Sequence, residues 1–266
     1  MAKARIGISG WRYPPWRHGK FYPKGLPQRE ELAYAARQFA TIELNGSFYS
    51  LQHPESYRQW HDATPGSFVF AVKAPRYITH VRRLHEIDKP LGNFFASGVL
   101  ELGKKLGPIL WQFPPNLRYD PDLFEAFLQQ LPRTTDEASE LARHHDRIRH
   151  PVIHSSVRRR LRHAIEIRHE SFATPEFIAQ LRRHRIAVVL ADTAGKWPFI
   201  EDITAGFLYL RLHGDRKLYT SGYDEASLRW WKQRIHAWLR GGQPQRGASR
   251  VSTEAPPRRV GRDVYC

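Results

Sequence analysis

Polar and charged residues recur near the carboxyl ends of short apolar segments in this sequence. Residues 41–45 read TIELN and residues 207–213 read FLYLRLH, so large apolar side chains alternate with Glu43 and Arg211. Alternate side chains of a strand point to opposite faces. We therefore expect the polar residues of each segment to share one face, and in a barrel this face is the interior.

The candidates for a functional site come from such positions and from the loops that follow them. Those for catalysis are the acids and histidines Glu43, His80, Glu166, Asp192 and His213. Those for substrate binding are Trp11, Asn45, Lys73, Gln112, Arg168 and Arg211. Carboxylates beside a histidine suit proton transfer, and Lys and Arg suit a phosphate or carboxylate ligand. The acids could also hold a divalent ion, but interleaved Arg and Lys would lower cation affinity, so no metal ligand is assigned.

Each candidate also has a structural interpretation. Buried charges are tolerated only when they are paired and hydrogen-bonded, so Glu166 and Arg168 could belong to a satisfied network inside the fold. The first loop holds Trp11 and further aromatics among basic residues. Such a loop can stack bases or sugars. It can also pack on itself as a plug, and we favour the plug.

The elements that must position these residues alternate between apolar strands and amphipathic helices. Strand patterns occupy residues 5–9, 41–45, 68–73, 108–113, 164–168, 186–192 and 207–213, and an eighth begins at 263–265. Helix patterns occupy residues 30–39, 56–63, 93–106, 120–131, 135–147, 175–184 and 225–240. Alternating strands and helices predict a parallel sheet. No GxGxxG follows the first strand, so an α/β fold of the TIM (β/α)8-barrel type is favoured over a dinucleotide-binding fold.

The length of 266 residues suits one TIM-barrel domain over residues 1–266. Residues 133–160 read as a helical, basic insertion, and residues 241–262 as a loop rich in Gly, Pro and Arg. The chain ends just after the eighth strand begins, so strand 8 and its helix are expected to be incomplete.

Composition favours an anionic partner. The chain carries 42 Lys and Arg against 26 Asp and Glu, a formal net charge of +16, which suits a phosphorylated small molecule or nucleic acid. A single cysteine, Cys266, excludes a disulfide within the chain and a zinc site built from several cysteines. The sequence shows no signal peptide or membrane-spanning run, so we expect a cytoplasmic protein without a membrane partner.

Several segments, read in order, resemble the YecE-like family, also called domain of unknown function 72. They include IGISGWRYPPWRHGKFYP, FVFAVKAPRYITH, GPILWQFPPNL, RHAIEIRHESF, ADTAGKWP and LYLRLHG. The resemblance implies a TIM barrel and no established activity. The strand-end positions that match the family pattern are Glu43, Asn45, Lys73, His80, Gln112, Glu166, Arg168, Asp192, Arg211 and His213. The chain departs from that pattern in its longer, more basic region 133–160 and in lacking the strand and helix that follow RDVY.

Three functions are compatible with these features. The first is an enzyme or binder of a phosphorylated or carboxylated small molecule at the carboxyl ends of the strands. The second is a nucleic-acid-binding or metal-dependent nucleic-acid-processing protein, which is an analogy of fold. The third is a truncated copy without activity. The sequence identifies no cofactor and does not specify an oligomeric state.

Overall fold

A computed structural model describes residues 1–218, 220–244 and 248–266. The chain divides into two units. Unit 1 consists of residues 1–5, 111–131 and 163–266, and unit 2 consists of residues 6–110 and 132–162. Each unit joins segments that are distant in sequence. The single domain expected over residues 1–266 stays a prediction.

Unit 2 is built on parallel strands that follow one another in sequence and in space. The strands are β2 (Gly7–Ser9), β3 (Thr41–Leu44), β4 (Val69–Lys73) and β5 (Leu106–Gln112), whose last two residues belong to unit 1. Each pairs in parallel with the next. The helices are α1 (Glu31–Gln38), α2 (Gly46–Tyr49), α3 (Pro54–Asp62), α4 (Asp88–Ala96) and α6 (Thr135–Ala142). A π-helix, Tyr77–Val81, and 3-10 helices, Pro14–Trp16, Gln28–Glu30 and Val99–Lys105, complete the unit.

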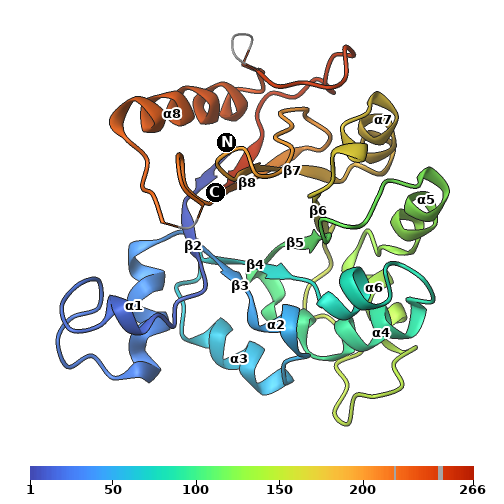
Figure 1. Ribbon diagram of the computed structural model, residues 1–266. Coiled ribbons are helices and arrows are strands. Elements are labelled where there is room, and N and C mark those ends of the chain that lie inside the picture. The colour runs from blue at the N-terminus through green and yellow to red at the C-terminus, as the bar shows by residue number, and fades with distance from the viewer. Residues whose placement is uncertain (219, 245–247) are drawn as a thin grey trace. The chain divides into compact units, whose positions relative to one another are not determined.

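Unit 1 repeats this plan. Its strands are β6 (Arg162–Glu166), whose first residue belongs to unit 2, β7 (Ala187–Asp192), β8 (Phe207–Leu212), β9 (Asp263–Tyr265) and β1 (Ala4–Arg5). They are parallel and paired in that order. Its helices are α5 (Pro121–Gln130), α7 (Pro175–His184) and α8 (Glu225–Leu239), with a 3-10 turn at Glu170–Phe172. Helix α8 packs Trp231 and Trp238 on Leu208 of β8 and Val264 of β9, and Figure 1 shows it beside these strands.

Parallel strands joined by helices, with each strand from β2 to β9 next to its successor, confirm the predicted fold class, an α/β fold of the TIM-barrel type. The expected start of an eighth strand is β9, which spans three residues and pairs with both β8 and β1. Strand β9 therefore supplies the pairing partner that the short N-terminal strand β1 needs.

Local sequence sets where several helices begin. The side chain of Asp120 accepts hydrogen bonds from the backbone amides of Asp122 and Leu123 at the start of α5. Thr174 and Asp224 cap α7 and α8 in the same way. Such caps satisfy amides that have no partner within the helix, typically contributing about 1 kcal/mol each.

Several predicted boundaries were wrong. The helix pattern 93–106 is α4, which ends at Ala96, followed by a separate 3-10 helix. Gly98 between them has a left-handed φ of 115°. A Cβ at this position would lie 2.5 Å from the Cα of Pro54 on α3, so the close approach of α3 requires glycine here.

Two further segments differ from the expectation. Strand β6 ends at Glu166, so Arg168 lies beyond the strand rather than within it. In the region 133–160 the helix α6 ends at Ala142, and the rest consists of turns and irregular backbone with an isolated bridge between Thr134 and Arg160. Residues 241–244 and 248–262 hold no helix or strand, which agrees with the predicted loop, and residues 245–247 lie outside the described chain.

None of the helices in the described ranges is both long and apolar enough to cross a membrane. The cytoplasmic location stays a prediction.

Candidate functional site

Glu166, at the carboxyl end of β6, is the centre of the charged group in unit 1. Its side chain is fully buried, and each carboxylate oxygen accepts a hydrogen bond from a different arginine. Nε of Arg168 donates to Oε1 over 2.9 Å, and Nη1 of Arg211 donates to Oε2 over 2.5 Å. We call Glu166, Arg168, Arg211 and the neighbouring Trp197 the Glu166 cluster. It unites residues from two strand ends that are distant in sequence.

The environment of Glu166 keeps its carboxylate ionised. Burial by itself opposes ionisation, but the charges of Arg211 and Arg168 outweigh burial and lower the pKa of Glu166 from 4.5 to about 2. At neutral pH the cluster therefore carries two positive charges and one negative charge. A carboxylate of such low pKa is a weak proton acceptor. Glu166 is therefore better suited to orienting the two arginines than to acting as a general base.

Arg168 is held on two sides. Its Nε is bonded to Glu166, and its Cζ lies 3.9 Å from the centroid of the Trp197 ring. The Nζ of Lys196 lies 5.1 Å from the same centroid. Among the residues that the structure describes, the terminal nitrogens Nη1 and Nη2 of Arg168 have no hydrogen-bond partner. The guanidinium is thus fixed in place with its outer donors available.

Asp192, the last residue of β7, forms a second polar group in unit 1. Its Oδ2 accepts a hydrogen bond of 3.0 Å from the hydroxyl of Tyr223, and that hydroxyl accepts one of 3.2 Å from the amide of Gly214. The amide of His213 donates to the carbonyl oxygen of Asp192 over 2.9 Å. Burial raises the pKa of Tyr223, and the charge of Asp192 acts in the same direction. The tyrosine therefore stays protonated and donates to the carboxylate.

Asp192 also lines a cavity of about 460 Å3. The other walls include Asp215, Phe199, Trp230 and Trp231. The hydroxyl of Ser227 donates to Asp215 over 2.9 Å. This part of unit 1 therefore combines carboxylates with aromatic walls.

In unit 2, Glu43 and Asn45 meet at the end of β2. The hydroxyl of Ser9 donates to Oε1 of Glu43 over 3.0 Å and accepts from Nδ2 of Asn45 over 2.6 Å. Both partners come from the end of β3, and Ser9 is opposite Glu43 in the parallel register. The alternation in TIELN thus predicted that these two side chains share a face.

Lys73 and His80 meet at the ring of Phe48 on α2. The Nζ of Lys73 lies 4.0 Å from the centroid of this ring, and the imidazole of His80 packs edge-on against it at 5.2 Å. Nδ1 of His80 is 2.8 Å from the hydroxyl of Thr79. The carbonyl oxygen of Lys73 accepts a hydrogen bond from Ser47. The short helix α2 after β3 and the loop after β4 together position both residues.

Two further candidates are buried. Gln112 lies at the end of β5. Trp11 packs edge-on against Trp60, with ring centroids 5.7 Å apart, and its carbonyl oxygen accepts from the hydroxyl of Tyr22. The other aromatics of the first loop pack on one another and on Tyr34 of α1. These contacts support the interpretation of the loop as a plug.

Sequence reasoning missed two participants. Tyr223 follows no strand directly, and only folding brings it to Asp192. Trp197 lies in the segment ADTAGKWP. Its position shortly after Asp192, in a loop that follows a strand, could have indicated that it belongs to the site. Within the described ranges, no group of three or more His, Cys, Asp or Glu side chains could hold a metal ion.

Comparisons with known proteins give a family. A family model described as "Protein of unknown function DUF72" matches residues 5–252. The UPF0759 protein YunF of Bacillus subtilis (strain 168) is 32% identical over 115 residues, covering 41% of this chain and 39% of YunF. The UPF0759 protein YecE of Escherichia coli (strain K12) is 32% identical over 121 residues, covering 45% of this chain and 43% of YecE. The matched region thus spans about two fifths of the length of these curated relatives.

Solved structures share the fold. A DUF72 family protein of Thermotoga maritima has a TM-score of 0.66 at 24% identity, covering 87% of this chain and 85% of that one. A DUF72 family protein of Enterococcus faecalis has a TM-score of 0.61 at 17% identity, covering 89% and 85%. At such identities the likeness concerns the fold alone.

Proposed function

The chain belongs to the DUF72 family, and from this premise we propose that it binds a phosphorylated or carboxylated small molecule at the Glu166 cluster. Arg168 and Arg211 are the ligands for the anion in this proposal, and Glu166 orients them. Family membership specifies no reaction, so the proposal depends on the side chains of unit 1.

The observation that carries the proposal is the state of Arg168. Its Nε is bonded to Glu166 and its face lies on Trp197, while its terminal nitrogens donate to no residue of the described chain. A guanidinium presents these donors in a planar fork that matches two oxygens of a phosphate or carboxylate. Because the side chain is already oriented, little conformational entropy is lost when an anion binds.

The charge of the cluster supports the same ligand. A buried ion pair with matched charges would be satisfied by itself. Here one carboxylate faces two arginines, and Lys196 adds a third cation at the Trp197 ring. The excess of positive charge favours an anion at this place, and burial strengthens the attraction by reducing solvent screening.

Asp192 is the residue that we propose for proton transfer, if the ligand is also a substrate. In the described part of the chain this carboxylate forms no ion pair, in contrast to Glu166, and its side-chain partner is the neutral Tyr223 hydroxyl. No ion pair therefore has to be broken before this carboxylate accepts a proton. The catalytic roles of Glu43, His80 and His213 stay predictions.

The test is a calorimetric titration with inorganic phosphate, a panel of sugar phosphates and a panel of short carboxylic acids. We expect at least one of these anions to bind, and Arg168→Ala to weaken its binding at least about tenfold, because hydrogen bonds to charged groups typically contribute about 1.5–3 kcal/mol. Trp197→Leu keeps the charge but removes the stacking surface, so it should weaken binding to a smaller extent.

Arg58→Ala is the matched control, since Arg58 is likewise an arginine held by carboxylates, Glu55 and Glu101, but on the surface of unit 2. Equal affinity in Arg168→Ala and Arg58→Ala would refute the proposal. The nucleic-acid alternative predicts a different result, namely binding to oligonucleotides that weakens steeply with salt and responds to several surface arginines rather than to Arg168.

A further inference from the structure

A cavity of about 330 Å3 lies in unit 2 beside the carboxyl ends of β3 and β4. None of its lining residues was among the candidates that the sequence suggested. Its walls come from α2, which follows β3, from the π-helix that follows β4, from α4, and from the region 133–160. Barrels of this type bind their ligands in the loops that follow the strands, so the position is that of a ligand site.

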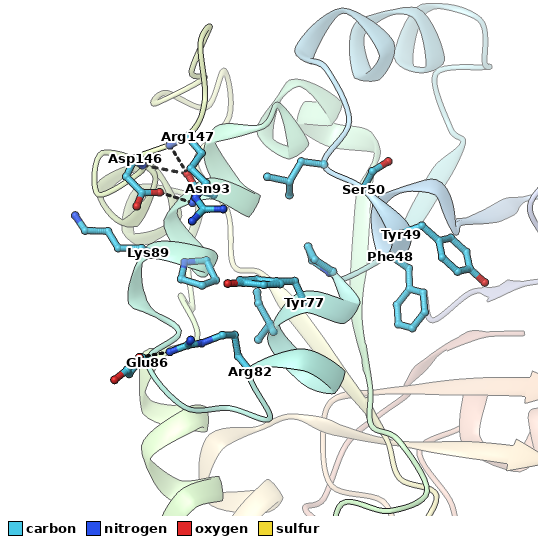
Figure 2. A pocket seen from close by; sticks show the side chains of 14 residues that line it. Phe48, Tyr49, Ser50, Tyr77, Arg82, Glu86, Lys89, Asn93, Asp146 and Arg147 are labelled. Atoms are coloured by element: carbon cyan, nitrogen blue, oxygen red, sulfur yellow. Dashed lines mark hydrogen bonds and ion pairs between the residues drawn. The ribbon is translucent and has the colours of Figure 1, made fainter.

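Aromatic rings are presented to solvent at this cavity. Tyr77 is 43% exposed and Tyr49 is 71% exposed. Figure 2 shows Tyr77 between the Arg82–Glu86 ion pair and Arg147. An exposed tyrosine ring at the mouth of a cavity offers a flat surface on which a planar ring can stack.

Two of the cations at the cavity are uncommitted. The ammonium of Lys89 and the guanidinium of Arg147 form no ion pair or side-chain hydrogen bond with residues that the structure describes. Arg82, in contrast, is bonded to Glu86 and to the carbonyl oxygen of His85. Two free cations can contact different oxygens of one phosphate, which offers more acceptor oxygens than a carboxylate does.

The acids of the cavity cancel only part of this charge. Glu86 is paired with Arg82. Oδ1 of Asp146 accepts a hydrogen bond of 2.7 Å from Asn93, whose own oxygen accepts from the amides of Asp146 and Arg147. Asn93 thereby fixes the segment that carries Arg147. Counting three cations against two acids, the lining has a net charge of +1.

The backbone around Tyr77 is irregular. Tyr77 begins a π-helix, a conformation that is rare and often found at functional sites. The loop that follows has left-handed backbone at Arg83, Leu84 and Glu86, with φ of 49°, 73° and 49°. Residues other than glycine rarely adopt this conformation, and it tends to occur where ligands are bound. This loop brings Arg82 and Glu86 together at the edge of the cavity.

We propose that this cavity binds a nucleoside monophosphate, with its base stacked on Tyr77 and its phosphate on Lys89 and Arg147. The volume is at the lower end of the range for small-molecule sites, which suits one nucleotide rather than a polymer. This site shares no residue with the Glu166 cluster, so nucleotide binding here does not depend on the proposed function.

Calorimetric titration of the full chain with AMP, GMP, CMP and UMP, and with adenosine and inorganic phosphate alone, tests this site. We expect at least one nucleotide to bind more tightly than adenosine or phosphate. Tyr77→Ala should weaken nucleotide binding about tenfold, the scale of a lost base–aromatic stack, whereas Tyr77→Phe should bind like the parent because it keeps the ring.

Charge variants test the phosphate contact. Lys89→Ala and Arg147→Ala should each weaken nucleotide binding about three- to tenfold and leave adenosine binding unchanged. Lys104→Ala and Arg149→Ala are the matched controls, because both residues are exposed and lie outside the lining. The proposal is overturned if no nucleotide binds, if Tyr77→Ala binds like the parent, or if Arg149→Ala costs as much as Arg147→Ala. Loss of AMP binding in Arg168→Ala but not in Tyr77→Ala would also overturn it, and would place the nucleotide at the Glu166 cluster instead.

Discussion

Replacing Glu166 by Gln removes a buried charge that faces two arginines. The pKa of Glu166 falls from 4.5 to about 2 in the folded chain, and a decrease of about 2.5 units at about 1.4 kcal/mol per unit corresponds to about 3 kcal/mol of stability at neutral pH. Gln keeps one acceptor oxygen for one arginine, but its NH2 group is a donor and cannot accept a hydrogen bond from the second arginine. We therefore expect Glu166→Gln to lower the free energy of unfolding by about 3–5 kcal/mol, the usual range for breaking a buried pair.

The pH dependence gives this prediction a distinct signature. Because the folded pKa is depressed, the contribution of Glu166 is fully present above the ordinary value of 4.5 and is lost as the pH falls toward 2. The parent chain should lose stability across this interval, and Glu166→Gln should lose about 3 kcal/mol less, since its side chain does not titrate.

Urea unfolding of both chains between pH 7 and pH 3 measures the effect, and about 2 kcal/mol of the difference should develop within this range. Glu55→Gln is the matched control, because Glu55 pairs with Arg58 while its side chain is 63% exposed, and exposed pairs typically contribute about 0–1 kcal/mol. The reasoning fails if Glu166→Gln is as stable as Glu55→Gln at pH 7, or if the stability difference between parent and Glu166→Gln is the same at pH 7 and pH 3.

Three further substitutions test other parts of the structure, each by urea unfolding at pH 7. Tyr223→Phe removes the hydroxyl that donates to Asp192, so we expect a loss of about 1–3 kcal/mol, and unchanged stability would show that this bond contributes nothing. Burial raises the pKa of Tyr223 above 10.0. Its contribution is thus present below pH 10 and lost as the pH rises further, and in Tyr223→Phe the alkaline loss should be smaller. Asp120→Ala removes the cap of α5 and should lower the free energy of unfolding by about 1 kcal/mol. Asp122→Ala, two residues further along and not at the cap, should lower it less. Gly107→Ala places a Cβ 2.5 Å from Cγ1 of Val69 and 2.6 Å from the carbonyl oxygen of Phe70, so we expect a cost of about 1–3 kcal/mol, and a variant as stable as the parent would contradict the packing around β5.

The fold class could be predicted because its signals are local. Apolar residues in IAVVLAD and FLYLRLH predicted β7 and β8 to within a residue or two. The helix pattern 175–184 predicted α7, whose start the Thr174 side chain caps. Periodicity and capping act over a few residues, so they survive in the sequence alone.

The wrong boundary predictions come from contacts between distant segments, which local sequence patterns do not indicate. Nothing near Gly98 in the sequence indicates that α3 passes close by, yet this approach requires glycine at the point between α4 and the 3-10 helix. The left-handed backbone after the π-helix also has no signal in the sequence, since Arg83 and Glu86 are ordinary helix formers.

The sequence by itself determined which residues share a strand face, because the alternation of side chains is a property of the extended backbone. Glu43 with Asn45 is an example, and their common partner Ser9 lies on the neighbouring strand β2. Only the tertiary structure decided what these side chains do. Glu166 is a suitable base as an isolated carboxylate, and it became an ionised anchor because folding buried it between Arg168 and Arg211. Folding likewise placed Lys89, Arg147 and an exposed tyrosine around one cavity. Burial and proximity between distant parts of the chain depend on packing, which no local pattern encodes.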